Sequence, residues 1–320
     1  MFVRSILALS LSCILTGTAF AAATTTDRPL TPQKTVTVAQ DPIDPLAVDT
    51  NSTAASAVEI SPQEQQDLNQ AADTLQKLES TEVKTADIAS APTTSTTPVG
   101  QAPSKVSWSL DSLNNAEWYE NIGKGQFPVY ARAHVMLNNA HASPGAIDGS
   151  SGMNTLKAIA SFQQMNGLKA TGELNKETWD TLVAKQGNKP AYVEYTITDA
   201  DLKGPYAASI PRDYALQAKM KGLYYTRVTE MLGEKFHMDE EFLKKLNPKA
   251  TFKKAGERII VTNIRNELPE NIHLIVAHKG AKQLYLFNAQ NQMVGSFPAT
   301  IGSSDTPSPT GTYKVTGVAP

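Results

Sequence analysis

Apolar residues recur at helical spacing in three short segments near the middle of the chain. The first covers about residues 129–140, the second about residues 154–166, and the third begins after Asn175 and ends before Gly187. Asparagine is a favoured N-cap residue, and glycine is favoured just past a helix end. Pro-Gly and Asp-Gly pairs interrupt the chain between the first two segments. The pattern therefore predicts a small bundle of three helices.

A second pattern, in residues 213–263, predicts a helix, a turn, a second helix, a loop and a short strand. Asp239 is placed to cap the second helix. Asn247 ends this helix, because a residue that precedes proline is pushed out of the helical region. Gly256 precedes the strand sequence Arg-Ile-Ile-Val. The segment shows no evident first strand of the usual length, and we interpret it as part of a small α/β module.

From Ile272 onward, the pattern changes to that of strands. Residues 272–277, 283–287 and 293–302 are separated by turn-like sequences, which predicts a β-meander. The meander is expected to continue through the loop Ser-Ser-Asp-Thr-Pro-Ser-Pro-Thr-Gly into residues 312–319. Together the three patterns predict a multidomain α+β chain with an all-β last part.

The front of the chain lacks core-forming residues. Residues 22–107 contain no Phe, Tyr or Trp and are rich in Thr, Ala, Ser, Gln and Pro. Such a composition buries too little apolar surface to offset the chain entropy lost on folding, so a disordered linker is expected. One helix is predicted inside this linker, opening at Ser61-Pro62 and carrying one apolar face made of Leu68, Ala72, Leu75 and Leu78.

Residues 1–21 have the features of a secretory signal peptide. Arg4 supplies the positive start, residues 6–15 form a short apolar run, and Ala19-Phe20-Ala21 offers small residues for cleavage. The apolar run is too short to span a bilayer in the mature protein. We therefore expect export to the periplasm and no transmembrane segment in the mature chain.

The only cysteine, Cys13, lies inside the predicted signal peptide. Ser10 stands where a lipoprotein signal would have leucine or a similar residue, which argues against lipidation. The mature chain is therefore expected to form no disulfide and to have no thiol chemistry of its own.

The net charge of the chain is −2, and it becomes −3 without residues 1–21, which contain one arginine and no acid. The chain has no basic excess that could neutralise a row of phosphates. Nucleic acid is therefore not an expected partner.

The five histidines do not form a metal-binding motif in the sequence. His134 and His141 are seven residues apart, but the following Ser-Pro-Gly turn leaves His141 at or past a helix end. His273 and His278 are five apart, so they would point to opposite sides of a continuous strand. Neither pair has a carboxylate at the spacing of zinc enzymes. We expect surface or partly buried histidines, with no metal and no cofactor.

Charged residues of the second pattern are spaced for helix pairing. Glu240 and Glu241 each precede a lysine by four residues, so ion pairs with Lys244 and Lys245 are expected on a solvated helix face. A binding patch is the alternative interpretation of this charge cluster.

Two further groups of residues near the bundle, one acidic and one aromatic, bear on a possible sugar site. The acids Asp148, Glu173 and Asp180 do not predict a glycosidase pair, because the sequence does not define the distances between them. Three aromatic residues precede the bundle and are expected to pack on it, with stacking on sugar as the alternative. They are Trp108, Trp118 and Tyr119.

The predicted bundle resembles a known domain. The sequence ARAHVMLNNAHASPGAIDGSSGMNTLKAIASFQQMNGLKATGELNKETWDTLV contains an Ile-Asp-Gly turn and Gly-Met-Asn-Thr at the start of the second helix. Thr-Gly-Glu-Leu and Thr-Trp-Asp-Thr-Leu follow in that order. These features resemble the three-helix peptidoglycan-binding domain. The resemblance implies that residues 108–190 bind peptidoglycan, with glycan strands and stem peptides as partners.

Residues 191–265 resemble a divergent LysM-type module. The shared features are the helix end Leu-x-x-x-Asn-Pro and the strand Gly-x-x-Ile-x-Val. The missing first strand is a departure from the usual pattern of this module.

Residues 270–320 resemble the first part of a YkuD-type L,D-transpeptidase catalytic domain. The resemblance lies in the hairpin, the sequence Pro-Ala-Thr-Ile-Gly and the loop Thr-Pro-Ser-Pro-Thr-Gly before Thr-Tyr-Lys-Val. It implies acyl transfer between stem peptides by a cysteine that a histidine activates. The chain has no Cys after Cys13 and no His after His278, so we expect the catalytic residues beyond Pro320.

A chain that ends in an unfinished catalytic sheet is expected to be inactive as it stands. Its strand edges are expected to be unpaired, and apolar residues such as Leu284, Leu286 and Phe297 are expected to be uncovered. We therefore interpret the protein as a periplasmic peptidoglycan-remodelling L,D-transpeptidase that acts in cell wall biogenesis. The alternatives are a non-catalytic wall-binding protein and a wall hydrolase with the same binding modules.

Overall fold

A computed structural model describes most of the chain after residue 105 and two earlier segments. The described residues are 34–38, 60–80, 106–265, 267–268, 270–303 and 306–315. They belong to two compact units, each described by itself: unit 1 joins Met1–Ser80 with Leu268–Pro320, and unit 2 is Thr81–Glu267. The predicted signal peptide and much of the predicted linker lie outside the described residues.

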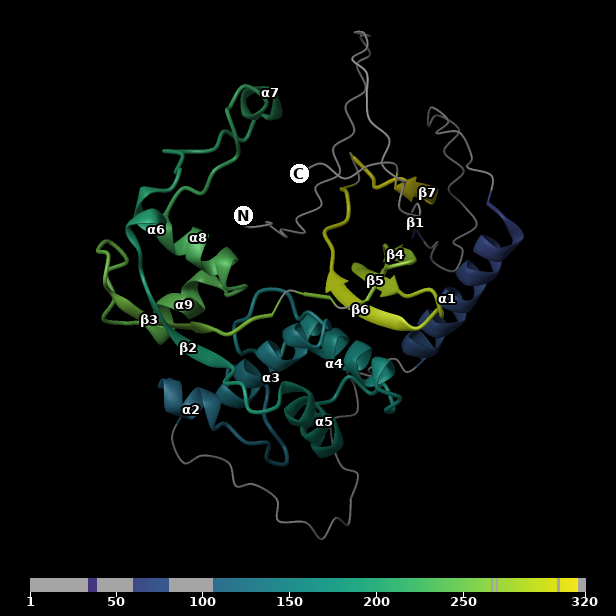
Figure 1. Ribbon diagram of the computed structural model, residues 1–320, viewed down its shortest axis with the longest axis horizontal. Helices are drawn as coiled ribbons and strands as arrows, with labels where there is room; N and C mark the ends of the chain where they lie inside the picture. The colour runs from purple at the N-terminus through teal and green to yellow at the C-terminus, as the bar shows by residue number, and fades with distance from the viewer. Residues whose placement is uncertain are drawn as a thin grey trace, which may run out of the picture. The chain divides into compact units, whose positions relative to one another are not determined.

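Unit 2 contains the predicted bundle of three helices, α3 (Pro128–Asn139), α4 (Met153–Met165) and α5 (Lys176–Gln186) (Figure 1). The Asn175 side chain accepts a hydrogen bond from the Thr178 N–H at 2.9 Å, as expected of an N-cap residue. The short helix α2 (Leu110–Asn114) precedes the bundle. The bundle core is made of apolar side chains from all three long helices, among them Leu137, Ile159, Phe162, Trp179 and Leu182.

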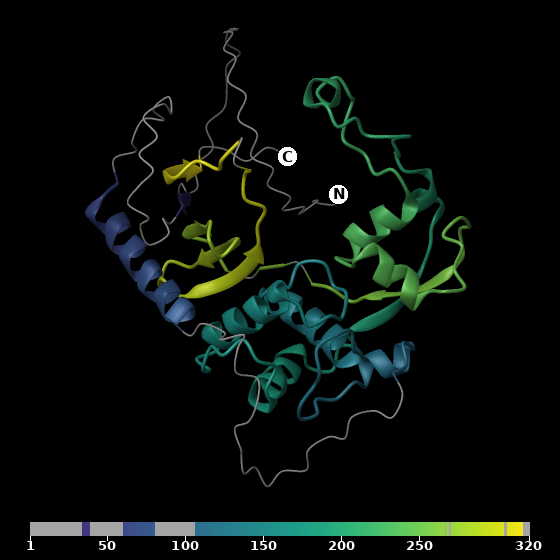
Figure 2. The same ribbon diagram turned by 180° about the vertical axis from the view of Figure 1, so that it is seen from behind.

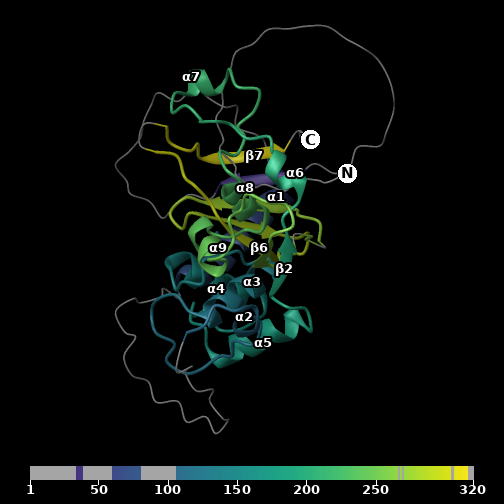
Figure 3. The same ribbon diagram turned by 90° about the vertical axis from the view of Figure 1, so that its left-hand side faces the viewer.

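The second half of unit 2 contains a pair of strands with helices between them in sequence. Strand β2 (Tyr192–Thr196) is antiparallel to β3 (Arg258–Thr262), and α8 (Val228–Lys235) and α9 (Glu240–Leu246) lie between them in sequence. The first strand that the pattern did not reveal is therefore β2, which lies upstream of residue 213. It was missed because residues 197–227, with the short helices α6 (Asp199–Lys203) and α7 (Tyr214–Gln217), separate it from α8. Figures 1 and 3 show α7 at the end of unit 2 opposite α5.

The two halves of unit 2 meet in a second hydrophobic cluster, beside the bundle core. Leu113, Val135 and Ile147 of the first half pack in the same cluster as residues of the second half, including Tyr192, Phe242, Leu243 and Val261. The Tyr192 hydroxyl also donates a hydrogen bond to the Ala131 carbonyl at 3.0 Å. The segments before and after the predicted boundary at residues 190 and 191 therefore pack against each other.

Charge pairing on α9 follows the prediction for one lysine and departs from it for the other. Lys244 pairs with Glu240 at 2.9 Å, as predicted. The predicted pair between Glu241 and Lys245 is wrong, because Glu241 pairs with Lys244 at 2.8 Å. The Lys245 ammonium instead lies 4.6 Å from the ring centroid of Trp108 and contacts the Gln126 side chain. Local spacing cannot reveal this partner, which comes from a distant segment.

In unit 1, β4 (Leu274–His278), β5 (Gln283–Phe287) and β6 (Met293–Pro298) form the predicted meander. The predicted continuation of the meander is wrong, because β7 (Gly311–Val315) does not pair with β6. The sheet has the order β6-β5-β4-β1-β7, in which β1 (Lys34–Val38) is parallel to β4 and antiparallel to β7. A strand is thus present inside the predicted linker, where Thr and Val alternate as strands favour.

The helix predicted after Ser61 is α1 (Pro62–Ser80), and it runs along the sheet of unit 1 (Figures 1 and 2). Its buried face carries Asp67, Ala71 and Leu75, whereas Ala72, which the pattern placed on that face, is exposed. Asp67 Oδ2 is 2.8 Å from His273 Nε2, and Asp67 Oδ1 accepts from the Asn291 amide at 2.9 Å. These contacts join the helix to the sheet, so it is not an isolated helix.

The two faces of this sheet differ in burial. Val276, Tyr285 and Phe287 are buried. The residues expected to be uncovered, Leu284, Leu286 and Phe297, are half-buried.

Candidate functional site

A buried glutamine organises the turn between α4 and α5. Gln163 is fully buried, and its amide nitrogen donates to the Thr178 hydroxyl at 2.8 Å and to the Glu173 carbonyl at 3.1 Å. Its amide oxygen accepts from the Gly172 N–H at 2.9 Å. Buried polar groups of this kind are costly unless they are bonded, so the network fixes the Thr-Gly-Glu-Leu turn on the bundle.

His134 joins α3 to the Ile-Asp-Gly turn in the interior of the bundle. Its Nε2 lies 3.0 Å from the Thr155 hydroxyl, which itself donates to the Ser150 carbonyl at 2.8 Å. The hydroxyl therefore accepts from His134 Nε2, and Nδ1 is left 3.7 Å from Asp148 Oδ1 without a hydrogen bond. Burial lowers the pKa of His134 to about 4, although the Asp148 carboxylate opposes the shift. His134 is neutral at pH 7 and has a structural position.

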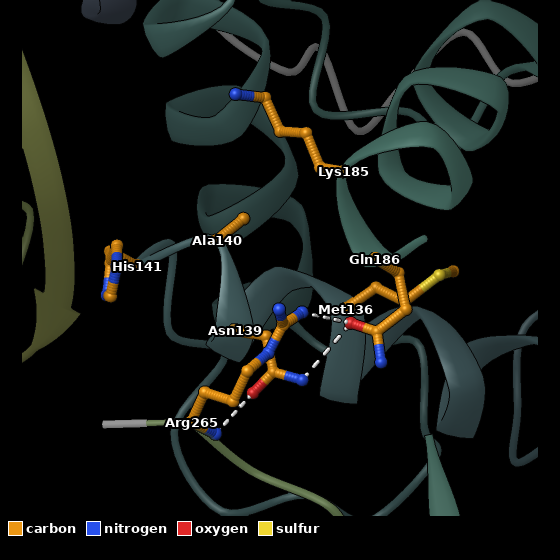
Figure 4. A pocket seen from close by; sticks show the side chains of 7 residues that line it. All are labelled: Met136, Asn139, Ala140, His141, Lys185, Gln186 and Arg265. Carbon is orange, nitrogen blue, oxygen red and sulfur yellow. Dashed lines mark hydrogen bonds between the residues drawn. The ribbon is translucent and has the colours of Figure 1, made fainter. Parts of the chain in front are cut away.

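A pocket of about 240 Å³ lies where the C-terminal ends of α3 and α5 meet the chain that follows β3 (Figure 4). We take it as the candidate site of unit 2 because two cations and two amides line it. The side chains around it are Met136, Asn139, Ala140, His141, Lys185, Gln186 and Arg265.

Hydrogen bonds among three residues fix one wall of the pocket. The Arg265 backbone N–H donates to Asn139 Oδ1 at 2.7 Å, and the side-chain Nη2 of Arg265 donates to Gln186 Oε1 at 2.8 Å. The Asn139 amide nitrogen donates to the same Gln186 oxygen at 3.2 Å. Figure 4 shows this triangle as dashed lines. The Gln186 amide is itself held by the Lys189 carbonyl at 3.1 Å, so its oxygen gives the Arg265 guanidinium a defined position.

The pocket has a positive charge. Lys185 and Arg265 are cationic, and no Asp or Glu lines the pocket among the residues that the structure describes. Burial, and then the nearby Arg265 cation, lower the pKa of His141 below its usual value and so disfavour its charged form. His141 follows α3 with a φ of 63°, which agrees with its predicted place past the helix end. An arrangement of this kind can bind an anion.

The other residues suggested by the sequence do not gather at this pocket. Asp148 lies beside His134, Asp180 pairs with Lys176 at 2.6 Å on the surface of α5, and the Glu173 carbonyl bonds to Gln163. In unit 1, His273 contacts Asp67, and His278 Nδ1 accepts from the Ala281 N–H at 3.0 Å. Within the described ranges, no three His, Cys, Asp or Glu side chains are grouped as metal ligands would be.

Of the three aromatic residues before the bundle, Trp118 and Tyr119 pack on its core, as expected, whereas Trp108 packs on Phe242 of α9. The rings of Trp108 and Phe242 meet edge to face at 5.5 Å. The Trp118 indole N–H donates to the Leu174 carbonyl at 2.6 Å, and Tyr119 is buried. These contacts support packing as the role of the three residues.

The pocket residues were missed by sequence analysis because they belong to no common motif. Asn139 and Arg265 are 126 residues apart in the chain. No local periodicity connects them, and only the folding of unit 2 brings them together.

A comparison with protein-family models matches residues 133–182 to a peptidoglycan binding domain family. The chain therefore contains a peptidoglycan-binding domain. The match runs from α3 to α5 and confirms the resemblance of the bundle. Of the pocket residues, Lys185 and Gln186 lie just beyond the match, and Arg265 follows β3. The comparison detects no L,D-transpeptidase domain in the chain. No curated protein matches the chain.

Among the helices that the structure describes, none combines the length and the hydrophobicity needed to cross a membrane.

Proposed function

We propose that the protein binds peptidoglycan in the periplasm through unit 2 and carries the wall-binding part of an L,D-transpeptidase. The observation that carries the binding proposal is the domain match over residues 133–182, which coincides with three packed helices. The predicted signal peptide supports a periplasmic location.

The second half of unit 2 is proposed to act as a LysM-like module in the same binding function. The antiparallel pairing of β2 with β3, and the helices α8 and α9 that precede β3, support this proposal. The core that it shares with the bundle means that both halves would approach the wall as one body.

The full chain is expected to sediment with purified, insoluble peptidoglycan. The net charge of −2 is too small for general charge attraction to dominate. Retention should therefore survive about 1 M salt, at which the Debye length falls to about 3 Å. Sedimentation followed by gel quantification measures it.

A matched pair of variants controls this experiment. Phe162→Ala opens the core of the bundle and should abolish retention, whereas Met153→Ala, which changes an exposed position of α4, should leave retention unchanged. Loss of wild-type retention at moderate salt would contradict the proposal and favour plain charge attraction.

The transpeptidase part of the proposal is supported by the meander of β4, β5 and β6 and by the Thr-Pro-Ser-Pro-Thr-Gly loop before β7. In the reaction that the resemblance implies, a cysteine thiolate attacks the stem-peptide carbonyl next to the terminal D-alanine. The thiol proton passes to a histidine, backbone N–H groups hold the oxyanion, and D-alanine leaves. The amine of a neighbouring stem then releases the thioester.

Intact-mass spectrometry after incubation with a carbapenem tests this part. The 320-residue chain without residues 1–21 has no thiol, so no cysteine adduct is expected. The chain extended through its downstream coding sequence should gain one adduct. Turnover of a tetrapeptide stem by the 320-residue chain alone would contradict a cysteine mechanism and favour a hydrolase. Absence of an adduct on the extended chain would favour a non-catalytic wall-binding protein.

A further inference from the structure

We propose that the pocket at the ends of α3 and α5 binds a free carboxylate of a peptidoglycan stem peptide. This inference rests on the proposed wall-binding function and assigns a part of the wall polymer to a defined place on unit 2. The residues that carry it are Lys185, Arg265, Asn139 and Gln186.

Among the described residues, no carboxylate of the protein compensates the positive charge of the pocket. No carboxylate pairs with Lys185 or Arg265 among the described residues, although both are cations next to a cavity. Arg265 is half-buried, and its Nε is fully buried without a hydrogen-bond partner in this part of the chain. An anionic oxygen in the pocket would add a charge-assisted hydrogen bond to a guanidinium that already bonds to the Gln186 amide oxygen. A carboxylate suits a guanidinium because both groups are planar and can form two parallel hydrogen bonds.

The size of the pocket selects a small group. Its volume, about 240 Å³, lies below the roughly 300–1,000 Å³ of pockets that enclose drug-sized molecules. A disaccharide of the glycan strand would not be enclosed here, whereas the carboxylate end of a peptide would be. Stem peptides carry several free carboxylates, and the glycan backbone carries none apart from the lactyl groups to which the stems are attached.

The alternative is that Lys185 and Arg265 only stabilise the C-terminal ends of α3 and α5. This structural role accounts for less of the observed geometry. Cations are stabilising near helix C-termini because the last carbonyls carry partial negative charge. At α3, however, backbone N–H groups already bond these carbonyls: Ala140 donates to Met136, His141 to Asn138, and Ala142 to Leu137. Arg265 donates its side-chain hydrogen bond to the Gln186 amide and not to a helix carbonyl. The guanidinium is thus held at the cavity by the Gln186 side chain, and the Arg265 backbone by Asn139.

The position of Arg265 explains why this site needs the whole of unit 2. Arg265 follows β3, and its backbone N–H is bound by Asn139 at the end of α3. The matched domain by itself, residues 133–182, would lack Lys185, Gln186 and Arg265. The second half of unit 2 therefore completes the pocket.

Isothermal titration calorimetry of the full chain tests the proposal. The probe is the synthetic stem L-alanyl-γ-D-glutamyl-meso-diaminopimelyl-D-alanine, compared with the same peptide after amidation of its carboxyl groups. The double variant Lys185→Gln/Arg265→Gln should bind the acid form about tenfold more weakly, a loss of about 1.4 kcal/mol. The amidated peptide should bind wild type as weakly as the double variant binds the acid.

A charge-matched control is Lys169→Gln/Lys254→Gln, which removes two cations from exposed positions away from the pocket. It should bind the acid peptide within about twofold of wild type, because isolated surface charges contribute little. Lys185→Gln alone changes an exposed side chain outside the hydrogen-bonded triangle, so it keeps the test valid if Arg265→Gln unfolds unit 2. It should still weaken binding several-fold.

Two results would overturn the proposal: no measurable binding of the acid peptide, or equal weakening by the pocket and control variants. Sedimentation of wild type with insoluble peptidoglycan separates this failure from that of the proposed function. If the wild-type chain sediments but the pocket variants bind the peptide with unchanged affinity, only the pocket assignment fails. If wild type does not sediment at all, the wall-binding proposal fails as well.

Discussion

Replacing Phe242 with alanine is expected to destabilise the whole of unit 2 by about 3–5 kcal/mol, the usual cost of removing a buried phenylalanine side chain. Phe242 is 1% exposed and packs in the core that α2, α3, β2 and β3 share. Its ring also meets Trp108 edge to face. Because α3 contributes buried residues both to this cluster and to the separate bundle core, the bundle should unfold in the same transition, although Phe242 lies outside the matched residues 133–182.

Tryptophan fluorescence measures this effect, since Trp108, Trp118 and Trp179 are the three tryptophans of the chain and all belong to unit 2. The melting temperature reported by fluorescence should fall by roughly 10 °C or more. Retention on peptidoglycan should be lost over the same temperature range. Leu223→Ala is the control, because Leu223 is 64% exposed and its truncation should change stability by less than about 0.5 kcal/mol. A bundle that keeps its wild-type melting temperature in Phe242→Ala would show two independent domains.

Lowering the pH from 7.5 to 5 is expected to remove about 2 kcal/mol of the stability of unit 2 through His134 alone. The pKa of His134 falls from its ordinary 6.5 to about 4 on folding, because the ring is buried. The unfolded chain therefore binds the proton more tightly than the folded chain. The contribution of His134 is complete above pH 6.5, is lost as the pH falls toward 4, and becomes constant below that.

Chemical denaturation at several pH values measures this loss. Burial also lowers the pKa values of His141 and His237, so they act in the same direction. Asp201 and Glu240, each with a pKa lowered to about 2, add their losses only below about pH 4.5. In His134→Gln the amide can still bond to Thr155, and the decline between pH 7.5 and 5 should become shallower by about 2 kcal/mol. An unchanged decline in this variant would assign the acid sensitivity to other groups.

The local sequence pattern was sufficient to predict the helices of the bundle and the strands of the meander. The helix start at Asn175 and the cap at Asp239 were predictable because their hydrogen bonds join residues three apart. Strands β4, β5 and β6 were predictable because each pairs with its neighbour in sequence. The identity of the domain at residues 133–182 also followed from the sequence, since its motifs occur in order over a short segment.

Tertiary structure alone decided the features that join distant residues. Strand β1 lies between β4 and β7, and no pattern near residues 34–38 specifies those partners. Lys245 was expected to pair with Glu241, but it lies over Trp108 because the fold places an aromatic face there. The candidate pocket needs Asn139, Gln186 and Arg265 together, and their side chains meet only after the two halves of unit 2 bury a common core. Sequence periodicity records which face of an element is apolar, whereas the partner of that face depends on the packing of the whole unit.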